Sequence, residues 1–162
     1  MMTEKATPGC LDTLMTIFSR ARRYMEETGN PNQWTDGYPD RDTIAADIRN
    51  GNCYVCRNDE GKIVATFALI IGRDPTYTQI QGGSWTDDDE YGVIHRMASD
   101  GSMKGMGKQC IDWCFKRIRN IRIDTHRDNL TMQHIVLGYG FKYCGIIYTH
   151  NHTPRLAYQL HI

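Results

Sequence analysis

The sequence predicts a mixed α/β fold in which helices cover both faces of one sheet. Two observations carry this prediction: apolar patterns of helical and of strand period alternate along the chain, and no internal repeat or linker interrupts them. Hydrophobic residues make up 40% of the 162 residues, enough to bury a core. Because one domain holds ~100–200 residues, we expect a single domain over residues 1–162.

Helical patterns dominate the first part of the chain. Apolar residues recur at three- and four-residue steps from Leu11 to Met25, and this helix is expected to end near Gly29. A second, short helix follows, which Asp42 can cap and which residues 50–52 stop.

Strands and helices then alternate to the end of the chain. A hairpin turn at residues 58–61 joins the first two strands, and Asp128 can cap the last helix. The expected elements are strands over 53–57, 62–71 and 91–99, a helix over 105–119, a strand from 121, a helix over 129–137, and strands over 141–148 and 156–160.

Charge and hydropathy exclude several classes of protein. Lys plus Arg and Asp plus Glu number 19 each, so the chain lacks the basic excess of a nucleic-acid binder. The longest apolar stretch, residues 64–71, is far shorter than the ~18–20 residues that cross a bilayer. The first residues carry no export pattern, and the six cysteines are scattered like core thiols. We therefore expect a cytoplasmic protein with no nucleic-acid or membrane partner.

The most informative run, residues 96–108, lies where a strand is expected to become a helix. Gly105 and Gly107 let the backbone come close to a ligand, and free amides at a helix N-terminus bind phosphate oxygens. Lys104 and Lys108 add positive charge. The run therefore predicts an anion site suited to a phosphate or pyrophosphate.

Two well-known phosphate loops do not match this run. Counted from Gly101, the Gly107-Lys108 pair arrives one residue late for a P-loop, and Gln109 replaces the required hydroxyl. A dinucleotide fingerprint requires a third glycine where Cys110 stands. Neither a magnesium nucleotide nor a dinucleotide is therefore the favoured ligand.

Residues 102–107, Ser-Met-Lys-Gly-Met-Gly, resemble the acyl-CoA loop of the GNAT superfamily of N-acetyltransferases, Gln/Arg-x-x-Gly-x-Gly/Ala between a strand and a helix. Ser102 departs from that pattern at its first position. Further along, Asn129, Met132 and the Gly140-Phe141 pair are similar to the second cofactor segment of the family. The resemblance spans nearly the whole chain.

The resemblance implies a mixed, mostly antiparallel sheet splayed in a V, with acetyl-CoA between two central strands as acyl donor and no metal. Pantetheine is then expected on the backbone of the strand end and pyrophosphate on the following loop. The expected cofactor-binding residues are Met97, Ala98, Ser99, Ser102, Met103, Lys104, Gly105, Met106, Gly107, Lys108, Asn129 and Met132.

The implied chemistry is direct attack of an acceptor amine on the thioester, which requires a base because amines are mostly protonated at neutral pH. Strand alternation predicts that His95, Val93 and Tyr91 share the face of Met97. His95 is the candidate base, and the alternative is a histidine that only forms structural hydrogen bonds. Glu90 takes the role if a bulge shifts the register.

The general acid stays unassigned, because Val136 stands where the family usually has a tyrosine. A thiol with a pKa near ~8.5 is already a fair leaving group. Trp34, Tyr38 and Trp85 either line the acceptor pocket or fill the core. The acidic run 87–90 either attracts an amine with more than one positive charge or is a solvated loop.

Three classes of function compete at this point. The favoured one is an N-acetyltransferase that transfers acetyl from acetyl-CoA to a small-molecule or peptide amine, as a monomer or a homodimer. The alternative is a non-catalytic acyl-CoA-binding protein of the same fold, which Ser102 and the missing tyrosine favour. No sequence feature supports the third, an interaction module that uses a sheet edge.

Overall fold

A single seven-stranded sheet organises the protein, in the order β1-β2-β3-β4-β5-β7-β6, and the computed structural model describes residues 1–162. The strands are β1 (Met2–Lys5), β2 (Cys53–Arg57), β3 (Ile63–Ile71), β4 (Gly92–Ser99), β5 (Asn120–Thr125), β6 (Lys142–Tyr148) and β7 (Pro154–His161). The helices are α1 (Leu11–Glu27), α2 (Arg41–Arg49), α3 (Met106–Phe115) and α4 (Leu130–Tyr139), with 3-10 turns η1 (Pro8–Cys10) and η2 (Pro75–Tyr77). The predicted mixed sheet is confirmed.

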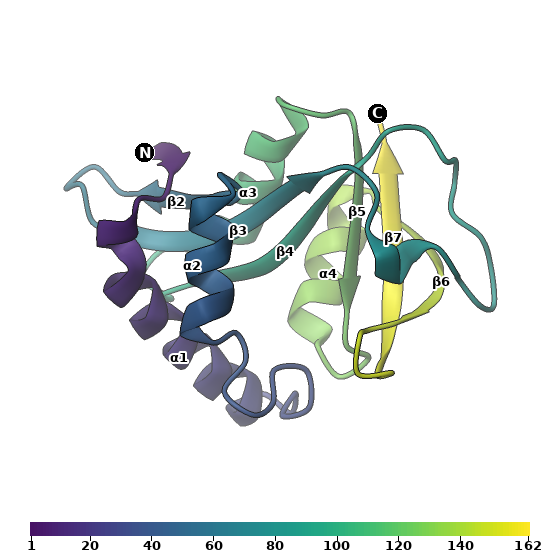
Figure 1. Cartoon of the computed structure of the whole chain (residues 1–162), viewed down its shortest axis with the longest axis horizontal. Helices are drawn as coiled ribbons and strands as arrows, with labels where there is room; N and C mark the ends of the chain where they lie inside the picture. The colour runs from purple at the N-terminus through teal and green to yellow at the C-terminus, as the bar shows by residue number, and fades with distance from the viewer.

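Helices cover both faces of this sheet (Figure 1). On one face, α1 and α2 pack on β2 and β3 around Phe18, Ile44 and Val55. On the other, α3 and α4 bury Ile111 and Val136 in a separate core. We call these the α1/α2 face and the α3/α4 face. The two cores arise because apolar side chains alternate between the faces of the central strands.

A third, smaller core lies on the α1/α2 side, where the segment after β3 covers β4 and β7. It includes Tyr77, Tyr91, Val93 and Ala157. Consecutive residues Val93 and Ile94 therefore contribute to different cores, as strand alternation requires.

Strands β4 and β5 form the only parallel pair and separate after two residue pairs. The register joins Gly92 to Ile121 and Val93 to Arg122, and no further pair follows. Figure 1 shows the two strands diverging from this shared end. Past Val93, the β4 edge that faces β5 has no strand partner, so its backbone groups are available to a ligand. The splayed V expected from the resemblance is confirmed.

A β-bulge corrects one sequence-based prediction. The β3–β4 register shifts between Thr66 and Ala68, and Arg96 has a φ of 50°. The extra residue turns Met97 onto the α3/α4 face, whereas His95 stays on the face of η2. The prediction that His95 and Met97 share a face is therefore wrong, because one extra residue reverses all later side chains.

Several predicted element ends were also wrong. Asp40, rather than Asp42, caps α2 by accepting a hydrogen bond of 3.1 Å from the Thr43 amide. Asn129, rather than Asp128, caps α4 by accepting one of 3.0 Å from the Met132 amide. Helix α3 ends at Phe115 rather than at residue 119. Strand β1 and the turn η2 were not predicted.

The cysteines are all free and buried, which confirms their assignment as core thiols. Cys53 and Cys56 belong to different cores on opposite faces of β2. No helix combines the length and the apolar character that crossing a bilayer requires.

Candidate active site

A cleft of about 850 Å³ borders the C-terminal end of β4, the start of α3, and one side each of α1 and α4. Ten of the twelve expected cofactor residues line it: Met97, Ala98, Ser99, Met103, Gly105, Met106, Gly107, Lys108, Asn129 and Met132. Ser102 and Lys104 do not line it. Two separate sequence segments, residues 97–108 and 129–132, are thus brought to one cavity.

The turn into α3 leaves backbone amides unpartnered at the cleft. Gly105 has a φ of 75°, in the left-handed region that glycine adopts without strain, and no side chain caps the helix. The first amides of α3 therefore lack hydrogen-bond acceptors and carry the positive end of the helix dipole. This arrangement suits a phosphate oxygen.

Gly107 also has a packing role. A Cβ at Gly107 would lie 3.0 Å from the Ile135 Cδ1 atom, closer than side chains normally approach. The glycine therefore lets α3 and α4 come together along one wall of the cleft.

Ser102 shapes the loop and does not face the cleft. Its amide and hydroxyl donate to Asp100 Oδ1 at 2.9 and 2.6 Å. Burial raises the pKa of Asp100, but the two hydrogen bonds from Ser102 outweigh burial, so the net shift of this pKa is downward. The residue that departs from the family pattern therefore stabilises a compact turn around an ionised carboxylate.

Helix α1 supplies a wall of the cleft whose individual residues were not predicted from the sequence. Arg20, Tyr24 and Met25 line it, together with Asn30 from the loop after the helix. The Tyr24 hydroxyl forms a hydrogen bond of 3.0 Å with the Thr131 hydroxyl of α4 and so joins the two walls. Residues 20 and 24 flank the apolar stripe of α1 and are one helical turn apart. This spacing is the sequence signal that could have identified the wall.

His95 lies on the opposite face, two residues past the last β4–β5 pair. Its Nε2 atom is 2.9 Å from Asp74 Oδ2, and its Nδ1 atom is 4.0 Å from Asp124 Oδ2. The His95 side chain is 22% exposed and that of Asp124 is 13% exposed. Tyr77 donates from its hydroxyl to Asp124 at 2.5 Å. His95 therefore stands where the strands begin to separate, between two carboxylates.

The protonation of Asp74 determines which His95 nitrogen carries hydrogen. Burial raises the pKa of Asp74, but hydrogen bonds from His95 and Thr76 outweigh it and lower this pKa to about 2. Asp74 is thus a carboxylate that can only accept. In neutral His95 the proton accordingly lies on Nε2, and the Nδ1 lone pair faces Asp124.

The other residues considered from sequence have different positions. Glu90 is exposed just before β4 and does not line the cleft. The bulge follows His95, so it does not bring Glu90 into register. Trp85 packs on Tyr77 and donates to its carbonyl oxygen at 2.9 Å, which supports the segment that carries Asp74.

Trp34 and Tyr38 form an aromatic wall on the α1/α2 face. Their ring centroids are 6.5 Å apart, and Trp34 packs edge-on against buried Phe18. The exposed Tyr38 accepts a hydrogen bond of 3.1 Å from Arg96. Arg96 in turn makes two bonds of 2.6 and 2.8 Å to Asp47. This loop is thus attached to the bulge of β4.

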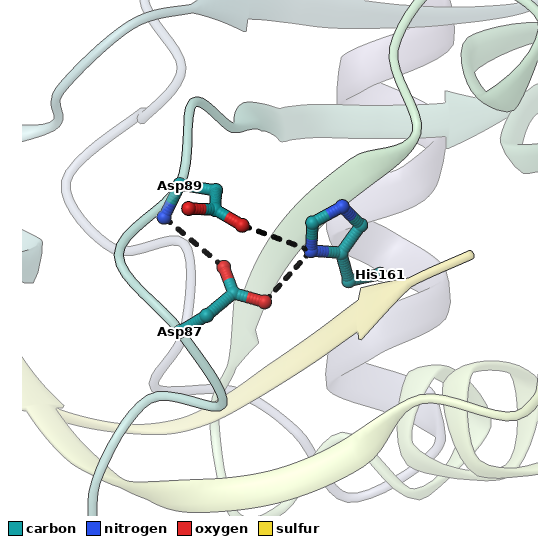
Figure 2. Close-up of side chains that lie close together, drawn as sticks. All are labelled: Asp87, Asp89 and His161. Carbon is teal, nitrogen blue, oxygen red and sulfur yellow. Dashed lines mark hydrogen bonds and ion pairs between the residues drawn. The ribbon is translucent and has the colours of Figure 1, made fainter.

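The acidic run 87–90 lies at the other end of β4, away from the cleft. Figure 2 shows Asp87, Asp89 and His161 together. Asp87 accepts bonds from His161 Nδ1 at 2.7 Å and from Asn120 Nδ2 at 3.0 Å, which ties the loop to the start of β5 and the end of β7. Figure 2 also shows the Asp89 amide directed at the same carboxylate. Asp87 therefore holds the closed end of the V together.

Comparison with solved structures places this architecture among acetyltransferases. A GNAT-family acetyltransferase from Streptococcus agalactiae is 32% identical in sequence and has a TM-score of 0.90. The match covers 99% of this chain and 95% of the chain of that protein. A GNAT-family acetyltransferase from Listeria monocytogenes is 21% identical over 99% of this chain and 94% of its own, with a TM-score of 0.75.

A more distant structure shares the fold. The phosphinothricin acetyltransferase of Sinorhizobium meliloti, solved in complex with AcCoA, is 14% identical over 99% of this chain and 88% of its own, with a TM-score of 0.64. No protein-family model matches the sequence, and no curated protein matches it.

Proposed function

The chain belongs to the GNAT family of acetyltransferases, and we propose that it transfers the acetyl group of acetyl-CoA to an amine by direct attack. One observation carries the proposal: the unpaired β4 edge past Val93 and the uncapped start of α3 border the same cleft. A strand edge suits the amides of pantetheine, and a helix N-terminus suits pyrophosphate.

Each expected cofactor contact has a physical reason. Met97, Ala98 and Ser99 present backbone donors and acceptors toward the cleft, because no β5 residue pairs with them. The first amides of α3 receive the pyrophosphate. Arg20 adds a guanidinium from the α1 wall, which favours a polyanionic ligand over a neutral one.

His95 is the proposed base. Its Nδ1 lone pair lies where β4 and β5 separate, and in this proposal an amine bound there attacks the thioester between the separated strands. His95 accepts a proton from the ammonium, and the neutral nitrogen then attacks the carbonyl carbon. The C–N bond forms, the C–S bond breaks, and the second proton of the nitrogen neutralises the thiolate.

The leaving thiolate needs no dedicated acid in this proposal, because a thiol with a pKa of ~8.5 leaves readily. Tyr139 lines the cleft, but its hydroxyl donates to Asp112 at 2.6 Å. Burial and that bond raise the pKa of Tyr139 to about 12. The cleft therefore contains a tyrosine engaged in structure rather than one free to protonate sulfur.

Calorimetric titration with acetyl-CoA tests the donor site, with ATP as the control. We expect binding of acetyl-CoA and CoA, and none of ATP, because ATP lacks the pantetheine that pairs with the β4 edge. Release of free CoA in the presence of amines then separates an enzyme from a non-catalytic acyl-CoA-binding protein. Absence of acetyl-CoA binding would refute the proposed function.

A further inference from the structure

Two hydrogen-bond acceptors face each other across the proposed acceptor position. The His95 Nδ1 lone pair and Asp124 Oδ2 are 4.0 Å apart, too far for a direct hydrogen bond. Burial and the Asp124 carboxylate raise the pKa of Tyr77, so the tyrosine stays a donor to the same oxygen. A nitrogen carrying at least two N–H groups can lie ~2.8 Å from both acceptors. An ammonium group has that form.

Arg155 is a buried cation without an ion pair on the same side of the sheet. The residue is 8% exposed, and its guanidinium donates to two backbone carbonyls, those of Pro154 and Gln33, each at 3.0 Å. Two other arginines with little exposure differ: the half-buried Arg96 pairs with Asp47, and the buried Arg122 lies 3.8 Å from Asp88. A buried charge with no carboxylate at ion-pair distance is costly, so Arg155 is suited to an anion supplied by a ligand.

Strand register brings the two features together. Asp124 of β5 is paired with Ala157 of β7, and paired residues share a sheet face. Arg155 stands two residues from Ala157 and so lies on that face as well, diagonal to Asp124, at a Cα separation of ~7–8 Å. The order across the sheet is His95, Asp124, Arg155.

Two pKa shifts reflect the burial of the Arg155 cation. Burial lowers the pKa of Arg155, and the charges of Asp124 and Tyr38 oppose that shift. Burial, followed by the positive charge of Arg155, lowers the pKa of His126.

We infer that the acceptor is an α-amino acid or a similar small zwitterion, with its ammonium between His95 and Asp124 and its carboxylate on Arg155. This inference rests on the proposed function and names the substrate class of the same site. It replaces the expectation of an amine with more than one positive charge, which depended on the acidic run 87–90. That run lies at the closed end of the V.

The test compares matched acceptors: a panel of α-amino acids, their α-carboxamides and the corresponding decarboxylated amines, each with saturating acetyl-CoA. CoA release gives kcat/KM for each compound. We expect at least one amino acid to exceed its own carboxamide ~10-fold or more, since a charge-assisted bond to a buried guanidinium is lost in the amide. Equal rates for acid and amide, or acetylation of decarboxylated amines alone, would overturn the inference.

Two variants separate the proposed contacts. Arg155→Gln should lower kcat/KM for the amino acid ~10-fold or more and leave the carboxamide unchanged, whereas Asp124→Asn should lower both. Arg155→Lys keeps the charge and should recover part of the loss. Arg127→Gln removes an exposed arginine near the same strand end and is the control, with no expected change.

Binding measurements distinguish failure of this inference from failure of the proposed function. Titration of the protein with the same amino acids and carboxamides, without acetyl-CoA, examines the acceptor site alone. If the wild-type protein does not bind acetyl-CoA, the proposed function is refuted. Normal acetyl-CoA binding with no amino acid bound or acetylated refutes the assignment of Arg155 and Asp124. Circular dichroism of Arg155→Gln and Arg155→Lys verifies that both variants are folded.

Discussion

Where β4 and β5 separate, the two sides of the sheet present different kinds of groups to a ligand. On the cleft side, residues 97–108 line the cavity together with residues of α1 and α4, and the proposed donor contacts are backbone groups of β4 and the first amides of α3. On the α1/α2 face, the charged group consists of His95, Asp74, Asp124 and Arg155, each from a different segment. An acyl donor that a whole family uses can be bound by backbone groups, whereas recognition of a particular acceptor amine requires particular side chains.

This contrast predicts that mutations on the charged face alter catalysis, whereas mutations on the cleft face alter donor affinity. The largest expected effect is that of His95→Ala. We expect kcat to fall ~10²–10⁴-fold, the usual contribution of a general base, with the Kd for acetyl-CoA unchanged. Steady-state rates measure the change in kcat, and calorimetry measures whether the Kd for acetyl-CoA is unchanged. A parallel loss of donor affinity would contradict the separation of the two faces.

The bulge that joins the faces is expected to depend on the Arg96–Asp47 pair. Asp47→Ala leaves the guanidinium, whose side chain is 14% exposed, without its carboxylate. Breaking a buried pair on one side costs ~3–5 kcal/mol, so the free energy of unfolding in urea should fall by about that amount. The double variant Asp47→Ala/Arg96→Met is the control and should recover part of the loss. No change in Asp47→Ala would show that the pair does not hold the bulge.

The cleft face should be sensitive to small additions of volume. Gly107→Val places side-chain atoms against Ile135, where a Cβ alone would approach to 3.0 Å. We expect the Kd for acetyl-CoA to rise ~10-fold or more as α3 is displaced. Gly138→Ala is the matched control, because this helical glycine also lines the cleft and a Cβ there meets nothing within 4 Å.

In Gly138→Ala the donor affinity should stay unchanged, and the protein should gain up to ~1 kcal/mol of stability from helix propensity. A similar loss of affinity in both variants would mean that any added atom blocks the cleft. In that case the contact between α3 and α4 would not explain the result.

The smallest effect concerns acid stability on the charged face. The pKa of Asp74 falls from 3.8 to about 2 in the folded protein. Its ionised form therefore adds stability that is fully present above pH 3.8 and is lost as the pH falls through about 2. In the Asp74→Asn variant, the free energy of unfolding should therefore decrease less than in the wild-type protein as the pH falls from 3.8 to about 2. Urea midpoints between pH 2 and 5 measure it, and an unchanged slope would contradict this account.

Local motifs explain why much of the cleft could be predicted and the charged face could not. Gly105, Gly107 and the start of α3 follow each other in sequence, so their geometry depends on neighbouring φ and ψ angles. Asp74 and Arg155 stand in segments without any motif. Docking of the η2 segment on Tyr91 and His95 places Asp74, and pairing of β5 with β7 places Arg155 on the face of Asp124. The residues of the α1 wall were not predicted for the same reason.

The sequence by itself determined the order of helices and strands from α1 onward, the central β3, the buried thiols and the glycine-rich turn into α3, because these depend on periodicity and local conformation. The tertiary structure decided the facing of His95 and Met97, since a single extra residue at Arg96 reverses the alternation of β4. It also decided which charged side chains lie together where β4 and β5 separate. Contacts between distant segments depend on strand register and loop closure, which no local pattern encodes.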